Sequence, residues 1–215
     1  MYGMKHILTG LLLGGLSIGA SALVLEQAPK NLGDGSYSVG PAGAQIADNF
    51  QFASDVTLSD ISWWGSYDPV VPASESFTVR IFADNGSGLP QVTSLYEANY
   101  SGNGDSSDGL VDAFFEPVFR YDLGVSWLLS GGQDYYLSVF NNDDTNDWYW
   151  LEGLTGDDTG WSRSVDVDSW GDDSPTINMS FKLTADPTAN VPTPSTISLM
   201  LIFSLWMFRL AKKRS

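Results

Sequence analysis

Short runs in which apolar and polar residues alternate recur through the middle of this chain. The clearest are 77–81 (FTVRI), 119–123 (FRYDL), 135–139 (YYLSV) and 177–183 (INMSFKL). Successive side chains of a strand point to opposite faces, so this pattern is typical of antiparallel strands with one buried face. Clusters rich in Gly, Asp and Asn separate the runs, and no stretch between 26 and 186 keeps a helical period. The chain is therefore predicted to be all-β, an antiparallel β-sandwich of jelly-roll-like topology over residues 23–184.

One predicted strand departs from strict alternation. In 56–63 (VTLSDISW) the inward-facing set changes phase between Leu58 and Ile61. An extra residue in one strand of an antiparallel pair produces this shift, so we expect a β-bulge there.

The distribution of charge excludes one class of function. All 26 acidic residues lie between Glu26 and Asp186, and that stretch holds five basic residues, which are Lys30, Arg80, Arg120, Arg163 and Lys182. Nucleic-acid binding requires clustered Lys and Arg on phosphates, so no nucleic-acid partner is expected. An acidic surface of this kind favours solubility and the binding of divalent cations.

The residue types needed for most catalytic centres are also scarce. The chain has no cysteine, and its single histidine is His6 near the N-terminus. Residues 23–184 therefore lack the side chains needed for three kinds of centre: a Ser–His–Asp triad, a cysteine nucleophile and a zinc site with imidazole ligands. We expect a protein that is not an enzyme. A glycosidase with a carboxylate pair drawn from its glutamates is the remote alternative, with Glu75, Glu97, Glu116 and Glu152 as candidates.

The first 22 residues have the three parts of a secretory signal peptide. Lys5 and His6 form a charged start, an apolar run follows at 7–18, and the small residues Ala20-Ser21-Ala22 come next. The apolar run is shorter than the roughly 20 residues that span a bilayer. We therefore expect signal peptidase to cleave after Ala22.

The C-terminal segment is predicted to cross a membrane. Residues 185–194 read as an extended, proline-containing linker, and the apolar run 197–208 follows. The run ends in a basic cluster formed by Arg209, Lys212, Lys213 and Arg214. Positive charge is retained in the cytoplasm, so residues 195–215 are expected to form a transmembrane helix with a cytoplasmic tail. The preceding domain then faces outward, which agrees with the signal peptide.

The C-terminal pattern also resembles a known sorting signal. It is similar to the PEP-CTERM signal, which consists of a short proline motif, an apolar helix directly after it and a terminal basic cluster. The motif here is formed by Val191, Pro192, Thr193 and Pro194. Thr193 stands where glutamate is commonest in that family. The resemblance implies a Gram-negative bacterium, recognition of the tail by an exosortase, and transfer of the protein to the cell surface or an extracellular polysaccharide matrix. The runs 47–52, 61–65 and 77–90 resemble β-sandwich ectodomains of uncharacterised type that carry such tails.

Two further clusters suggest ligands for the sandwich. Carboxylates between 141 and 173 are expected to belong to solvated acidic loops. The alternative is a calcium site built from oxygen ligands, with Asp143, Asp147, Glu152, Asp157 and Asp158 as the candidate set. Four tryptophans could stack on the apolar faces of sugars or pack in the core: Trp63, Trp64, Trp148 and Trp150.

These observations give an ordered set of functional predictions. The leading one is an exported protein with a structural or interaction role, held at the inner membrane by its C-terminal helix or processed to the surface or matrix. A carbohydrate-binding module, stabilised by calcium or not, is the second, and the glycosidase is the third.

Overall fold

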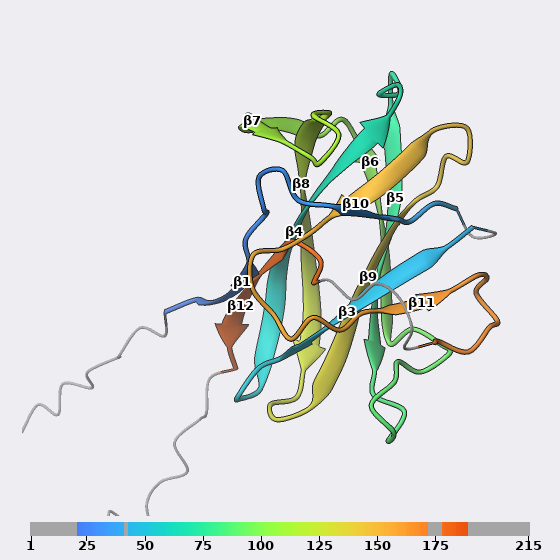
Figure 1. Cartoon of the computed structure of the whole chain (residues 1–215). Coiled ribbons are helices and arrows are strands. Elements are labelled where there is room, and N and C mark those ends of the chain that lie inside the picture. The colour runs from blue at the N-terminus through green and yellow to red at the C-terminus, as the bar shows by residue number, and fades with distance from the viewer. Residues whose placement is uncertain (1–20, 41–42, 172–177, 189–215) are drawn as a thin grey trace, which may run out of the picture.

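The computed structural model describes residues 21–40, 43–171 and 178–188, and this part of the chain forms two antiparallel sheets packed face to face (Figure 1). The predicted all-β class and its β-sandwich architecture are confirmed. Among the described residues there is no helix long and apolar enough to cross a membrane. The predicted signal peptide up to residue 20 and the predicted membrane helix at 195–215 lie outside the described residues.

The larger sheet is built around the long strand β4. Strand β8 pairs along one edge of β4, while β12 and β10 pair along successive parts of the other edge. Strand β1 then adds to β12, β2 adds to β10, and β7 adds to β8. The seven strands are β1 (Leu23–Gln27), β2 (Gly35–Tyr37), β4 (Val56–Asp68), β7 (Asp105–Val111), β8 (Pro117–Leu129), β10 (Asp147–Leu151) and β12 (Phe181–Pro187).

The smaller sheet has five strands in the order β11-β3-β9-β5-β6. They are β3 (Gln45–Gln51), β5 (Glu75–Ala83), β6 (Tyr96–Gly102), β9 (Asp134–Asn141) and β11 (Trp161–Arg163). Its central strand β9 is buried from Tyr135 to Asn141, so both faces are covered. Burial on one side only was therefore a wrong expectation for this strand. A second apolar cluster containing Phe82, Tyr136 and Trp170 covers the face that points away from the sandwich interior.

The strand faces that alternation predicted to be buried do point into the sandwich interior. Phe77, Val79 and Ile81 of β5 are fully buried in the main core. The rings of Trp63 and Tyr121 stack there with their centroids 5.4 Å apart. Aromatic pairs in such geometries add stability beyond that of the apolar area they bury.

The bulge expected in the long strand is confirmed. Along the β4–β8 pair, Leu58 lies opposite Trp127 but Asp60 lies opposite Gly124, so the register shifts between these pairs. The shift returns Ile61 to the interior after Leu58, which explains how both side chains are fully buried.

The two ends of the described chain lie beside each other. Leu23 of β1 pairs with Ala185 of β12. Strand β12 runs on to Pro187, and the amide and hydroxyl of Thr188 both donate to the carbonyl oxygen of Asp55 at 3.1 Å. The predicted linker at 185–194 thus began too early, because the backbone of its first residues is paired with β4.

Candidate functional site

Three of the four tryptophans proposed to bind glycans lie in the core. Trp63, Trp148 and Trp150 have 0% exposure, and the indole nitrogen of Trp150 donates to the carbonyl oxygen of Ser180 at 2.8 Å. Their strands place all three side chains between the sheets. Of the two alternatives for these three rings, core packing is the one that holds, because no face of any of them is available to a sugar.

Trp64 alone of the four lies on the outer face of the seven-stranded sheet. Its neighbour Trp63 points inward, so alternation turns Trp64 outward, where it packs against Val118 and Leu151. The guanidinium of Arg120 lies over the ring, with Cζ 5.7 Å from its centroid. As a result Trp64 is only 6% exposed.

A surface hollow of about 460 Å³ lies beside Trp64, and we call it the Trp64 hollow. Its lining residues come from three adjacent strands of the seven-stranded sheet, β4, β8 and β7. In the strand register, Trp64 is paired with Arg120 and Arg120 with Asp105, so these three side chains form one row across three strands. The lining residues are Trp64, Asp105, Ser106, Ser107, Leu110, Arg120 and Asp122.

Hydrogen bonds fix the polar groups of the Trp64 hollow. Arg120 donates to Oδ1 of Asp122 from Nε at 3.1 Å and from Nη2 at 2.6 Å. The hydroxyl of Ser62 donates to the same carboxylate and accepts from Nη2 of Arg120. Oγ of Ser107 is buried and has no hydrogen-bond partner among the residues that the structure describes. The hollow thus combines an aromatic edge, a tethered cation, carboxylates and an unsatisfied hydroxyl.

The sequence contained part of the signal for this site. Alternation in 119–123 assigns Phe119, Tyr121 and Leu123 to one face, which leaves Arg120 and Asp122 together on the other. No pattern within β8 could indicate that Trp64 lies beneath Arg120, because β4 and β8 meet only in the folded sheet.

The proposed calcium ligands do not meet at one centre. Asp143 lies in the loop between β9 and β10, where its carboxylate accepts from the amide of Thr145 at 2.9 Å and from its hydroxyl at 2.6 Å. These hydrogen bonds lower the pKa of Asp143 below its usual value. Asp147 begins β10 at the other end of the same loop, which carries the chain from the five-stranded sheet to the seven-stranded sheet.

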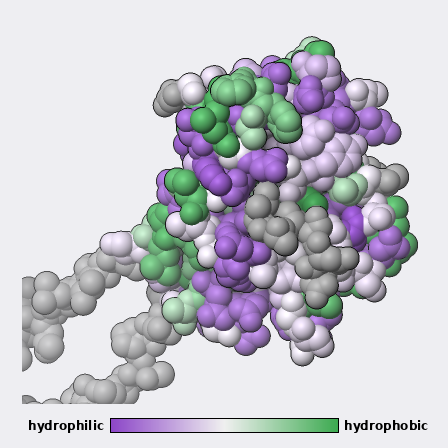
Figure 2. Space-filling model, viewed as in Figure 1, coloured by the Kyte–Doolittle hydropathy of each residue, from purple (hydrophilic) through white to green (hydrophobic). Residues whose placement is uncertain are grey.

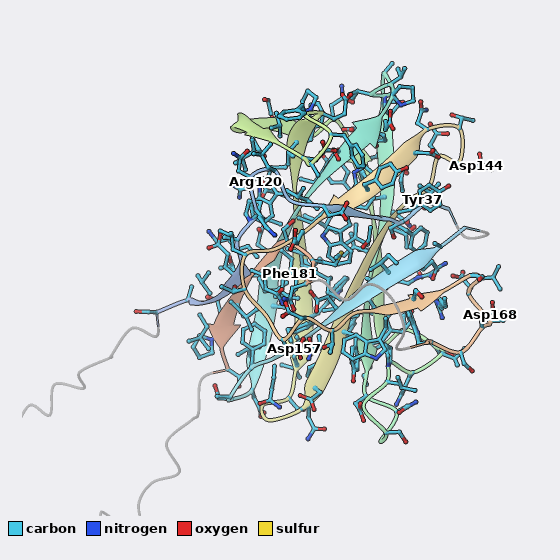
Figure 3. All side chains as sticks on the ribbon, in the orientation of Figure 1. Tyr37, Arg120, Asp144, Asp157, Asp168 and Phe181 are labelled. Carbon is cyan, nitrogen blue, oxygen red and sulfur yellow. The ribbon has the colours of Figure 1, made fainter. Side chains whose placement is uncertain are left out.

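The remaining calcium candidates are engaged elsewhere. Glu152 forms an ion pair with Lys30 at 2.7 Å. The amides of Asp157 and Asp158 donate to the side-chain oxygen of Asn178. Figure 3 shows Asp144, next to Asp143, and Asp157 in separate parts of the molecule. Within the described ranges, no three His, Cys, Asp or Glu side chains gather as metal ligands would.

Three of the four glutamates considered for glycoside hydrolysis are engaged in separate contacts. Glu75 is buried, and its carboxylate accepts from the hydroxyl of Tyr121 at 2.8 Å and from the amide of Gly104. Glu97 forms an ion pair with Arg80 at 2.7 Å, and Glu152 is held by Lys30. These contacts place the three carboxylates in different local networks rather than across a shared cleft.

Two arginines that sequence reasoning did not single out meet over the five-stranded sheet. Arg163 donates to Oε1 of Gln45 at 2.8 Å and to the carbonyl oxygen of Val92 at 2.8 Å. Arg80 donates to Asp166 at 2.6 Å. Burial lowers the pKa of Arg163 to about 10, and hydrogen bonds from Arg80 lower the pKa of Asp166. This network borders a cavity of about 170 Å³, and its main effect is to fasten the segment after β11 to β5.

A buried carboxyl links β3 to the segment that precedes β12. Asp48 of β3 faces the interior and accepts from the amide of Met179 at 2.6 Å and from the amide of Asn49 at 2.7 Å. Burial raises its pKa to about 8, against the opposing effect of these two donors, and the charge of Asp157 raises it further. Asp48 is not among the residues that line the Trp64 hollow, and we assign it a structural role.

Exposed apolar residues gather in the loop that joins β7 and β8. Phe114 is 73% exposed and Phe115 is 75% exposed, and Phe115 has a φ of 68°, a conformation that favours glycine. Asp112 shapes the loop, because its Oδ1 accepts from the amides of Phe114 and Glu116. Figure 2 shows apolar surface at the end of the molecule where β7 lies.

Comparison with known proteins gives no family. No protein-family model matches the chain, and no curated protein sequence matches it. Among solved structures, the chain is similar to VP2 of infectious bursal disease virus in a subviral particle, with 8% identity and a TM-score of 0.24. The similarity covers 88% of this chain, which spans 48% of the viral chain. A likeness at this level carries no argument about fold or function.

Proposed function

We propose that this protein is an exported surface- or matrix-associated protein with a structural or interaction role, delivered by its PEP-CTERM-like tail. Signal peptidase and an exosortase-like enzyme would be its processing partners, and the outward-facing sandwich would be the part that functions. A non-catalytic role agrees with the lack of cysteine, the single histidine His6 and the dispersed glutamates.

The pairing of β1 with β12 carries this proposal. The residue that follows the expected cleavage site is Leu23, and it begins β1 opposite Ala185. Strand β12 leads directly toward the VPTP segment and the tail. Both predicted targeting segments are therefore attached at the same end of the sandwich, as expected of a domain that is anchored to a membrane through that end.

The opposite end offers the surface for interaction. Strand β4 runs from Val56, which pairs with Pro187, to Asp68 at the other end of the sheet. The loop with Phe114 and Phe115 follows β7 near that distant end, since Ser66 pairs with Val118 at the start of β8. Large apolar groups exposed away from the tail support contact with another component at the surface.

The test is the intact mass of the full chain from its native host, measured in each cell fraction. We expect a mass lacking residues 1–22 and the tail after the VPTP segment, in the surface or released fraction. A double variant, Pro192→Ala with Pro194→Ala, keeps the apolar run intact. It is expected to retain the tail and to remain in the inner membrane.

Two results would contradict the proposal. One is a wild-type protein that keeps residues 1–22 and stays in the cytoplasm. The other is a variant lacking residues 191–215 that reaches the same fraction as the wild type, because the tail would then have no part in delivery.

A further inference from the structure

We propose that the Trp64 hollow is a binding site for a neutral saccharide. The site deepens the interaction role proposed above but does not depend on how the tail is processed. It differs from the tryptophan surface expected from the sequence, because only one of those four rings takes part and the polar groups come from β7 and β8.

The size of the hollow suits a small ligand. Its volume of about 460 Å³ falls within the range of about 300–1,000 Å³ typical of small-molecule sites. Trp64, Arg120, Asp122 and Asp105 come from paired strands, so these lining residues are held before any ligand arrives, whereas Ser107 and Leu110 lie where the register of β7 shifts. A preformed site of this kind loses little conformational entropy on binding.

The lining groups match the two kinds of surface that a sugar presents. A pyranose ring has an apolar face of C–H groups, which can pack on the edge formed by Trp64 and Leu110. Its hydroxyls both donate and accept. The carboxylates of Asp105 and Asp122 accept such donors, while the guanidinium of Arg120 donates to hydroxyl oxygens.

The hydroxyl of Ser107 gives independent support for a ligand at this place. A buried polar atom without a partner is unfavourable, so native proteins satisfy nearly all such atoms with protein, water or ligand. Oγ of Ser107 lacks a partner within the described part of the chain, and Ser107 lines the hollow. Because this oxygen is enclosed, the side chain of Ser107 must turn toward the hollow before a ligand group could satisfy it.

Charge selects for a neutral ligand rather than an anionic one. The hollow contains two carboxylates and one cation, and Asp122 already pairs with that cation at 2.6 Å. The chain as a whole carries a formal charge of −16. A uronic acid or a sulfated sugar would be repelled by the carboxylates of the hollow and by the net negative charge of the chain, whereas an uncharged sugar would not.

Arg120 is positioned to contact the ligand. Its side chain is substantially exposed, and hydrogen bonds to Asp122 and Ser62 hold the guanidinium over the ring of Trp64. A hydroxyl of a bound sugar would therefore meet a donor that is already oriented.

The test uses the full chain purified in detergent and titrated calorimetrically with hexasaccharides of β-linked glucose and of mannose, and with a polygalacturonate fragment of the same length. We expect at least one neutral hexasaccharide to bind and the anionic one not to bind. Asp105→Ala and Arg120→Ala are each expected to weaken binding by about tenfold, the effect of losing a hydrogen bond to a charged group.

Asp144→Ala is the matched control. Asp144 is exposed but lies in the loop between β9 and β10, away from Arg120 in Figure 3. It should bind as the wild type does, and all variants should keep the wild-type melting temperature. Absence of binding to both neutral sugars would overturn the proposal. So would binding only to polygalacturonate, or binding that Asp105→Ala and Arg120→Ala leave unchanged. None of these results would affect the mass and fractionation test of delivery.

Discussion

The carboxyl of Asp48 makes the stability of this protein depend on pH in an unusual direction. Burial raises its pKa from 3.8 to about 8 in the folded state, while the unfolded chain keeps a value near 3.8. A raised pKa means that the folded state holds the proton more tightly. The stabilising contribution is therefore complete below pH 3.8 and is lost as the pH rises through 8.

The size of the effect follows from the pKa difference. Each unit corresponds to about 1.36 kcal/mol, so between pH 5 and pH 8 the free energy of unfolding should fall by about 4 kcal/mol through this group alone. That is a large share of the roughly 5–15 kcal/mol that stabilises a typical domain. The single histidine is His6, so no histidine of the sandwich titrates in the same interval.

The variant Asp48→Asn removes the titration. At pH 5 it should be about 1–3 kcal/mol less stable than the wild type, because its NH2 group would face one of the amides of Asn49 and Met179. By pH 8 the order should be reversed, because the wild type loses about 4 kcal/mol over this interval and the variant loses none of it. Denaturant unfolding followed by tryptophan fluorescence at each pH measures this, with Asp144→Asn as a control that should follow the wild type. Parallel curves for Asp48→Asn and the wild type from pH 5 to 8 would refute the reasoning and mean that Asp48 stays ionised.

Three further substitutions test the packing of the sandwich and the arginine network. Gly65→Ala should lower the free energy of unfolding by about 3 kcal/mol, because a Cβ atom there would lie 2.4 Å from Cζ2 of Trp148. Gly124→Ala, which meets nothing within 4 Å, should change it by less than about 0.5 kcal/mol, and equal losses in the two would contradict this account. Arg163→Met should cost about 3 kcal/mol, since it leaves the buried oxygen of Gln45 without its donor at 2.8 Å. A melting temperature unchanged by Arg163→Met would show that the arginine network does not hold the segment after β11.

The sequence alone determined which side of several strands is buried and where the long strand bulges. Alternation in 77–81 identified Phe77, Val79 and Ile81 as core residues, and the change of phase after Leu58 identified the shift in register. These features follow from the geometry of one strand, in which side chains alternate whatever the partner strand is. The predicted targeting segments are likewise local patterns of length, hydropathy and charge, and they stay predictions.

Only the tertiary structure decided what covers each face. Periodicity could not place Trp148 inside, nor put Arg120 and Asp105 in one row with Trp64, because these residues belong to strands that meet only after folding. The same reason explains β9, whose second face is covered by a segment distant in sequence. A strand's own residues fix which side chains share a face, whereas long-range packing fixes whether that face meets the core, a hollow or solvent.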